Sequence, residues 1–168
     1  MLTPQDIIDL LGLVPLAPEG GFYRETYRSD EFIGASALPK RYEGRRGMGG
    51  AIYYLLTPDS FSAIHRLATD EVYHFYLGDP VELLRLLPDG SSDTVILGHN
   101  IMQKMVLQIV VPRSVWQGAR LVPGGGFALL GTTTAPGFDP ADYEHGDRDR
   151  LIKMYPGARD MIVALTRS

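Results

Sequence analysis

The sequence contains no cysteine in its 168 residues. This absence excludes disulfide bonds, thiolate metal sites, cysteine nucleophiles and iron–sulfur clusters. A chain that does without disulfides suits a reducing compartment, so we expect a cytoplasmic protein. The first residues, MLTPQDIIDLLGL, also lack the basic region and the continuous apolar run of a signal peptide.

Positive charge and long apolar runs are scarce as well. The 16 Lys and Arg residues are outnumbered by 20 Asp and Glu residues, which gives a formal net charge of −4. This balance argues against the phosphate contacts that drive nucleic-acid binding, and no apolar run approaches the ~18 residues of a membrane span. Residues 40–46 are rich in arginine, and we predict an exposed loop there, with an anion or nucleic-acid contact as the alternative. We expect neither a nucleic acid nor a membrane as a partner.

What the sequence has instead is a series of short segments typical of β-strands. From residue 51 onward they recur at intervals of roughly ten residues, separated by turn sequences such as Pro88-Asp89-Gly90. Many short strands with few helices between them favour a β-sandwich or a barrel. The length and the 45% hydrophobic content favour a single domain over residues 1–168. The predicted strands are 22–27, 51–56, 62–67, 71–77, 81–87, 94–97, 105–111, 114–121 and 127–134.

Helices are predicted only near the two ends of the chain. Thr3-Pro4-Gln5-Asp6 provides a capping residue, a proline at the first helical position and an acidic first turn, and Gly12 is a suitable stop. Two short helices are expected at 147–154 and 158–165, where they would cover one end or one face of the β-structure. Residues 29–50 are rich in glycine and proline and show no periodicity, so we predict a long loop.

The stretch from Ser60 to Gly78 holds the residues best suited to chemistry. It reads as two strands joined by a short polar turn. Alternation places His65 and Leu67 on one face of the first strand, and Glu71 and Tyr73 on one face of the second. We expect a hairpin that brings His65 and Glu71 together, in a ligand pocket or as half of a metal site.

His65, Glu71 and Gly78 stand at the spacing of the first cupin motif, and Pro112 fits the second. More specific stretches lie at 19–27, 65–67, 70–76, 110–112, 116–117 and 135–139. Through these residues the chain resembles the cupin superfamily and, within it, the family called cupin 5 or DUF985. The resemblance covers nearly the whole chain. It implies an all-β fold, the double-stranded β-helix or jelly roll, and a homodimer.

The resemblance also raises the question of a metal ion, because cupins normally hold one with three histidines and a glutamate. Here Leu67 replaces one of those histidines and Gln117 replaces another. An apolar side chain cannot coordinate a metal, and an amide is a weak ligand for the metals that imidazole prefers. We therefore predict a metal-free polar pocket and no cofactor. The alternatives are a divalent metal on His65, Glu71 and Gln117, and a buried His–Glu network with a purely structural role.

For function we predict that the barrel binds a small polar ligand, sugar-nucleotide-like or carboxylate-like. If the protein is an enzyme, His65 paired with Glu71 would be the base and Tyr73 the acid. That arrangement is similar to the metal-independent sugar-nucleotide epimerases among cupins. The alternatives are a metal-dependent isomerase or dioxygenase, and a non-enzymatic storage or sensor protein. The predicted ligand-binding residues are Arg24, His74, Tyr76, Trp116 and Gln117.

Overall fold

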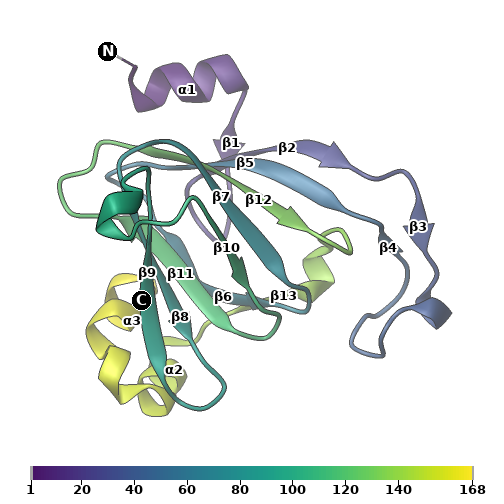
Figure 1. Ribbon diagram of the computed structural model, residues 1–168. Helices are drawn as coiled ribbons and strands as arrows, with labels where there is room; N and C mark the ends of the chain where they lie inside the picture. Colours follow the sequence, from purple (N-terminus) through teal and green to yellow (C-terminus); the bar gives the residue numbers. More distant parts are fainter. Residues whose placement is uncertain (1, 168) are drawn as a thin grey trace.

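The computed structural model describes residues 2–167 and places two antiparallel β-sheets face to face (Figure 1). The prediction of an all-β fold is confirmed. The six-stranded sheet has the order β1 (Val14–Pro15), β2 (Phe22–Arg28), β5 (Gly50–Leu56), β12 (Ala128–Thr134), β7 (Glu71–Gly78) and β10 (Gln108–Val111). The five-stranded sheet has the order β13 (Tyr143–His145), β6 (Ser62–Leu67), β11 (Trp116–Leu121), β8 (Val81–Leu86) and β9 (Ser92–Leu97).

The two strands of the stretch 60–78 do not pair with each other. Strand β6 pairs with β11 and β13 in one sheet, whereas β7 pairs with β10 and β12 in the other. The expected hairpin is therefore wrong: residues 68–70 cross from one sheet to the opposite one. The alternation pattern reports which side chains share a face of a strand, but it carries no information about which strand lies alongside. The strand faces that hold His65 and Glu71 lie opposite each other across the interior of the barrel.

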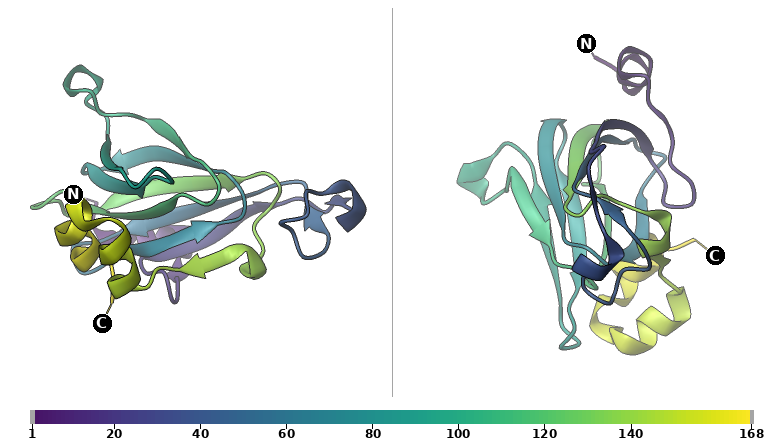
Figure 2. Two further views of the ribbon diagram at one scale, coloured as in Figure 1. Left: turned by 90° about the horizontal axis from the view of Figure 1, so that it is seen from below. Right: turned by 90° about the vertical axis from the view of Figure 1, so that its right-hand side faces the viewer.

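Short helices cover the outer faces of both sheets (Figures 1 and 2). Helix α1 (Pro4–Leu11) begins with the predicted Thr3 cap, ends at Gly12 and packs Ile7 against the six-stranded sheet. Helices α2 (Arg148–Met154) and α3 (Arg159–Ala164) pack over Trp116 on the five-stranded sheet. The predicted role of the tail is thus confirmed. Among residues 2–167, no helix is both long enough and apolar enough to span a membrane.

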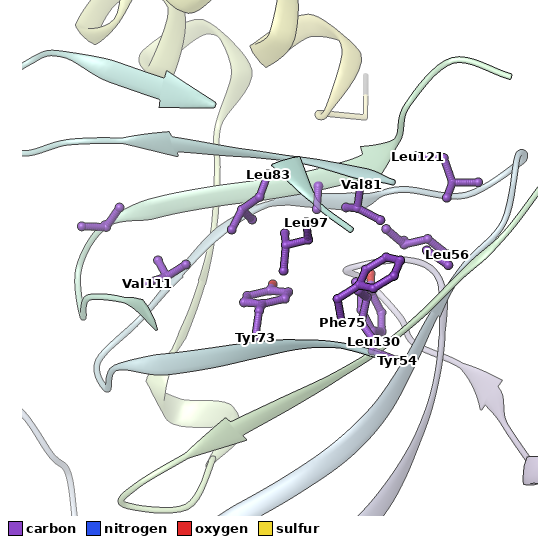
Figure 3. Close-up of a cluster of buried hydrophobic side chains, with 13 residues drawn as sticks. Tyr54, Leu56, Tyr73, Phe75, Val81, Leu83, Leu97, Val111, Leu121 and Leu130 are labelled. Atoms are coloured by element: carbon purple, nitrogen blue, oxygen red, sulfur yellow. The ribbon is translucent and has the colours of Figure 1, made fainter. Parts of the chain in front are cut away.

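The space between the sheets is apolar at one end and polar at the other. At the apolar end, Tyr54, Tyr73, Phe75 and Leu130 of the six-stranded sheet meet Leu83 and its neighbours from the opposite sheet (Figure 3). Further along the same strands the inward positions become polar. Glu71 follows this pattern on β7, and Thr132 and Thr134 follow it on β12. One sheet sandwich therefore provides a packed core at one end and room for a site at the other.

Residues 29–50, predicted as a loop, include a two-stranded arm that extends beyond the barrel (Figure 2). It is built from β3 (Phe32–Ile33) and β4 (Arg46–Gly47), with a 3-10 helix, η1 (Ala35–Ala37), between them. The prediction that residues 40–46 are exposed is wrong for Tyr42, which is 6% exposed, and for Arg46, which is 3% exposed. Its guanidinium donates from Nε and Nη2 to the two carboxylate oxygens of buried Asp142, at 2.9 and 2.7 Å. This bidentate pair ties the arm to the segment that leads into β13.

Candidate functional site

The polar end of the barrel contains a cavity of about 470 Å³, a size typical of small-molecule sites. Its wall includes His65 and Leu67 from β6, Glu71 from β7, and the threonines of β12. The base of the arm and the start of the chain complete the wall with Phe32, Gly47 and Glu19. The structure thus brings two of the three predicted catalytic residues, His65 and Glu71, into one cavity.

His65 is fixed so that one ring nitrogen remains available to a ligand. Its side chain is 2% exposed, and Nδ1 lies 2.8 Å from the backbone oxygen of Ala63. A carbonyl oxygen can only accept, so Nδ1 carries the proton and Nε2 of the neutral ring keeps its lone pair. The ring of Tyr143 stacks on the imidazole, with centroids 5.1 Å apart and planes at 19°. The stacking holds the plane of the ring, and the contact of Nδ1 with the Ala63 carbonyl favours the tautomer that can accept a proton at Nε2.

The carboxylate that approaches Nε2 of His65 is that of Glu19, with Oε2 at 4.0 Å. Oε1 of Glu19 accepts a hydrogen bond of 2.7 Å from the hydroxyl of Ser62. The backbone oxygen of Glu19 accepts a further bond from the Ala63 amide at 2.9 Å, which places the residue beside β6. Sequence reasoning missed this residue as part of the site, although Glu19 opens the family-specific stretch 19–27.

Glu71 is buried on the opposite sheet and interacts with Gln117. Gln117 Nε2 donates to Glu71 Oε2 at 2.7 Å. Burial raises the pKa of the Glu71 carboxyl, and the nearby charge of Glu19 raises it further, while His65 acts in the opposite direction. Gln117 Oε1 is buried without a hydrogen-bond partner among residues 2–167. A carboxyl with a raised pKa is suited to act as a proton donor near neutral pH.

Replacing Glu71 by glutamine is expected to stabilise the protein at neutral pH. The pKa of this carboxyl is higher in the folded chain than the ordinary value of 4.5, so the folded state binds more protons than the unfolded state. Stability is therefore lost as the pH rises from about 4.5 through the raised folded pKa. Glutamine keeps the shape and an acceptor for Gln117 but carries no charge, so its Tm should exceed wild type by about 2–4 °C at neutral pH, the shift that ~1 kcal/mol produces.

The measurement is thermal unfolding of both proteins between pH 4 and pH 8. Glu31→Gln serves as the matched control, because Glu31 is an exposed carboxylate and should leave the curve unchanged. Parallel curves for wild type and Glu71→Gln across this range would show that burial of Glu71 carries no energetic penalty.

Three of the predicted ligand-binding residues lie together on the outer face of the six-stranded sheet. The guanidinium of Arg24 lies over the ring of Tyr53, 5.4 Å from its centroid. Tyr76 packs edge-on against Tyr53 at 6.0 Å, and His74 stacks on Tyr76 at 6.3 Å. None of the three lines the cavity. On β2 the neighbours of Arg24 point inward instead, so its own side chain points out.

Two further predicted residues are core residues. Trp116 is 2% exposed and packs beneath α2 and α3, with the guanidinium of Arg66 4.6 Å from its ring centroid. Tyr73 is 1% exposed in the apolar core, and burial raises the pKa of its hydroxyl well above the ordinary value. Neither side chain belongs to the cavity wall. Among the cavity residues, Glu19 and Tyr143 contact the His65 ring instead.

The mouth of the cavity carries an ion pair that sequence reasoning did not single out. Both oxygens of Glu25 accept from Nε of Arg28, at 3.0 and 2.9 Å, and Nη2 lies 2.6 Å from Oε2. A register shift between Glu25 and Tyr27 brings both members of the pair to the cavity side of β2. Plain alternation would have placed them on opposite faces, so the sequence offered no signal for this pair.

The donor set does not fit the metal ion that many cupins hold. Leu67 lines the cavity beside His65, at the position of a second imidazole. Gln117 turns its Nε2 toward Glu71. Within the described residues, no three His, Cys, Asp or Glu side chains are grouped so as to hold a metal ion.

Residues 5–146 match the family described as cupin superfamily (DUF985), and the chain belongs to this family. It is 29% identical over 133 residues to an uncharacterized protein of Saccharomyces cerevisiae, a match that covers 74% of this chain and 66% of the yeast protein, just under two thirds. A hypothetical protein from Leishmania major is similar over 99% of this chain and 100% of its own, with a TM-score of 0.88 and 30% identity. A structure from Shewanella oneidensis has the same TM-score at 31% identity, over 99% of both chains. Membership in the cupin superfamily confirms the jelly-roll fold.

Proposed function

We propose that the cavity binds a small polar molecule and that His65 exchanges a proton with it, as in a metal-independent isomerase or epimerase. The observation that carries this proposal is the contact of His65 Nδ1 with the Ala63 carbonyl, which leaves Nε2 at the cavity wall without a hydrogen-bond partner among the described residues. A fixed imidazole with a free lone pair is a suitable general base near neutral pH. Glu19 would stabilise the imidazolium that forms.

The second proton-transfer group in this proposal is Glu71. Its carboxyl lines the same cavity from the opposite sheet, and its pKa is raised by burial. Isomerisation moves a proton from one position of a substrate to another, or from one face to the other, so an acid and a base on opposite walls suit it. Glu71 therefore takes the role of acid, for which Tyr73 was first considered. The predicted homodimer and the cytoplasmic location stay predictions.

The proposal is tested by deuterium exchange. The protein is incubated in D2O with a panel of aldoses, ketoses, amino sugars and sugar nucleotides, and NMR records the loss of carbon-bound hydrogen. Wild type should incorporate deuterium into at least one compound. Folded His65→Gln should be slower by about 10²–10⁴-fold, the usual contribution of a general base. His99→Gln is the matched control, because His99 lies in an exposed loop outside the cavity. Equal exchange rates in wild type and folded His65→Gln would contradict the role of His65.

A further inference from the structure

The charges of the cavity wall are unbalanced toward the negative. Glu19 and Glu25 line the cavity as carboxylates, beside the Glu71 carboxyl that holds its proton in the proposed function, and Arg28 is the only lysine or arginine among the lining residues. The guanidinium of Arg28 is already engaged, because Nε and Nη2 both contact the carboxylate of Glu25. The lining residues therefore offer a phosphate or carboxylate only one cation, which is already paired with Glu25 and is 60% exposed to solvent. The anionic ligand classes suggested by the sequence are disfavoured on this ground.

Two acceptor atoms in the cavity lack a donor between them. Nε2 of His65, on a side chain that is 2% exposed, makes no hydrogen bond to any described residue, and Oε2 of Glu19 lies 4.0 Å away. The other polar atoms of both side chains are satisfied by the Ala63 carbonyl and the Ser62 hydroxyl. A single nitrogen donor placed between the two acceptors would lie within about 2.8–3.0 Å of each. The buried imidazole thus points independently to a ligand that donates hydrogen bonds.

Aromatic rings form part of the cavity wall. Tyr143 stacks on His65, and Tyr23, Phe32 and Phe138 line the cavity. Aromatic faces attract organic cations through their quadrupoles, whereas they offer no compensation to an anion. A neutral hydroxyl compound would satisfy the acceptors but would bring no positive charge to the half-buried carboxylate of Glu19, which is 16% exposed.

Resting on the proposed function, which requires that the cavity bind a ligand, we infer that this ligand carries a cationic nitrogen group. An amine, amidine or guanidine would place its N–H donors between Glu19 and His65, with its organic part against the aromatic rings. Glu71 would face the same group from the opposite sheet. The substrate class is therefore an organic amine, and not a sugar nucleotide or a carboxylate.

The test compares four probes of similar size: benzamidine, benzylamine, benzyl alcohol and benzoate. Each is titrated at pH 7.5 into the full-length protein, with binding followed by two-dimensional NMR of the backbone amides. We expect the two cations to shift the amides around His65 and to bind at least 10-fold more tightly than benzyl alcohol, and we expect benzoate not to bind. Glu19→Gln should weaken benzamidine at least 10-fold, whereas Glu31→Gln, an exposed carboxylate outside the cavity, should have no effect.

Arg28→Met is a second variant, which should change the affinity for benzamidine in the opposite direction and can be measured even if Glu19→Gln does not fold. Arg28 is 60% exposed, so Arg28→Met should fold, release Glu25 and tighten benzamidine binding. Weaker or unchanged binding in Arg28→Met, or benzoate binding as tightly as benzamidine, would overturn the cationic preference and leave a ligand cavity in place. If none of the four probes shifted a cavity residue, the preference would be overturned and the proposed function would lose support as well.

Discussion

Replacing Arg46 by methionine should lower the free energy of unfolding by about 3–5 kcal/mol, the usual cost of removing one partner of a buried ion pair. The side chains of Arg46 and Asp142 are 3% and 2% exposed, so the variant leaves a carboxylate buried without its counter-ion. The substitution should also disturb the cavity, because Asp142 directly precedes Tyr143, which stacks on His65. Urea denaturation followed by circular dichroism measures the effect.

Two comparisons make this result specific. Arg113→Met removes an exposed contact with Asp70, 3.7 Å long, and should cost less than about 1 kcal/mol. The double variant Arg46→Met with Asp142→Leu removes both charges and should recover most of the stability lost by the single variant. A loss of less than 1 kcal/mol in Arg46→Met alone would mean that water or another group compensates Asp142.

Substituting alanine for Gly20 is expected to destabilise the chain by about 2–5 kcal/mol, through backbone strain and overpacking together. Gly20 has φ of 111°, a conformation that side chains disfavour, and a Cβ atom there would collide with the backbone oxygen of Phe61. The collision would displace the adjacent Glu19 from His65. Binding of benzamidine should therefore weaken in any folded fraction of the variant.

Gly12→Ala is the matched control for this variant. Gly12 also has a positive φ, 61°, but a Cβ atom there would meet nothing within 4 Å. Gly12→Ala should lower the free energy of unfolding only through backbone strain, by about 1–2 kcal/mol. Thermal unfolding of both variants compares the two costs directly. Equal losses at the two positions would show that the contact between Gly20 and Phe61 is not tight.

The extent to which the site could be predicted depends on how far apart its parts lie in the sequence. The alternation of β7 correctly assigned Glu71 and Tyr73 to the inner face and His74 to the outer face. It could not show that the inner face changes from apolar core to cavity between Tyr73 and Glu71, because that boundary depends on the opposite sheet. Glu19 was missed for the same reason, since its contact with His65 joins segments that no local pattern connects.

The positions of two arginines differ from the prediction for other reasons. The charge of Arg24 favours a role in ligand binding, but the strand sets its direction: Tyr23 and Glu25 face the cavity and Arg24 faces out. The charged and glycine-rich neighbours of Arg46 predict an exposed loop. Arg46 is buried because it pairs with Asp142, which lies 96 positions later in the chain. Composition describes an average environment, and a single buried ion pair lies outside its reach.

The crossing of residues 68–70 between the two sheets has a consequence for how the protein folds. Strands β6 and β7, which follow each other in the chain, lie in different sheets, and β5 pairs with the distant β12. Long loops must therefore close before these contacts contribute, which predicts folding on the order of milliseconds to seconds. His65 and Glu71 come to face one cavity only after the sheets have docked, so a bound ligand should slow unfolding and leave the folding rate nearly unchanged.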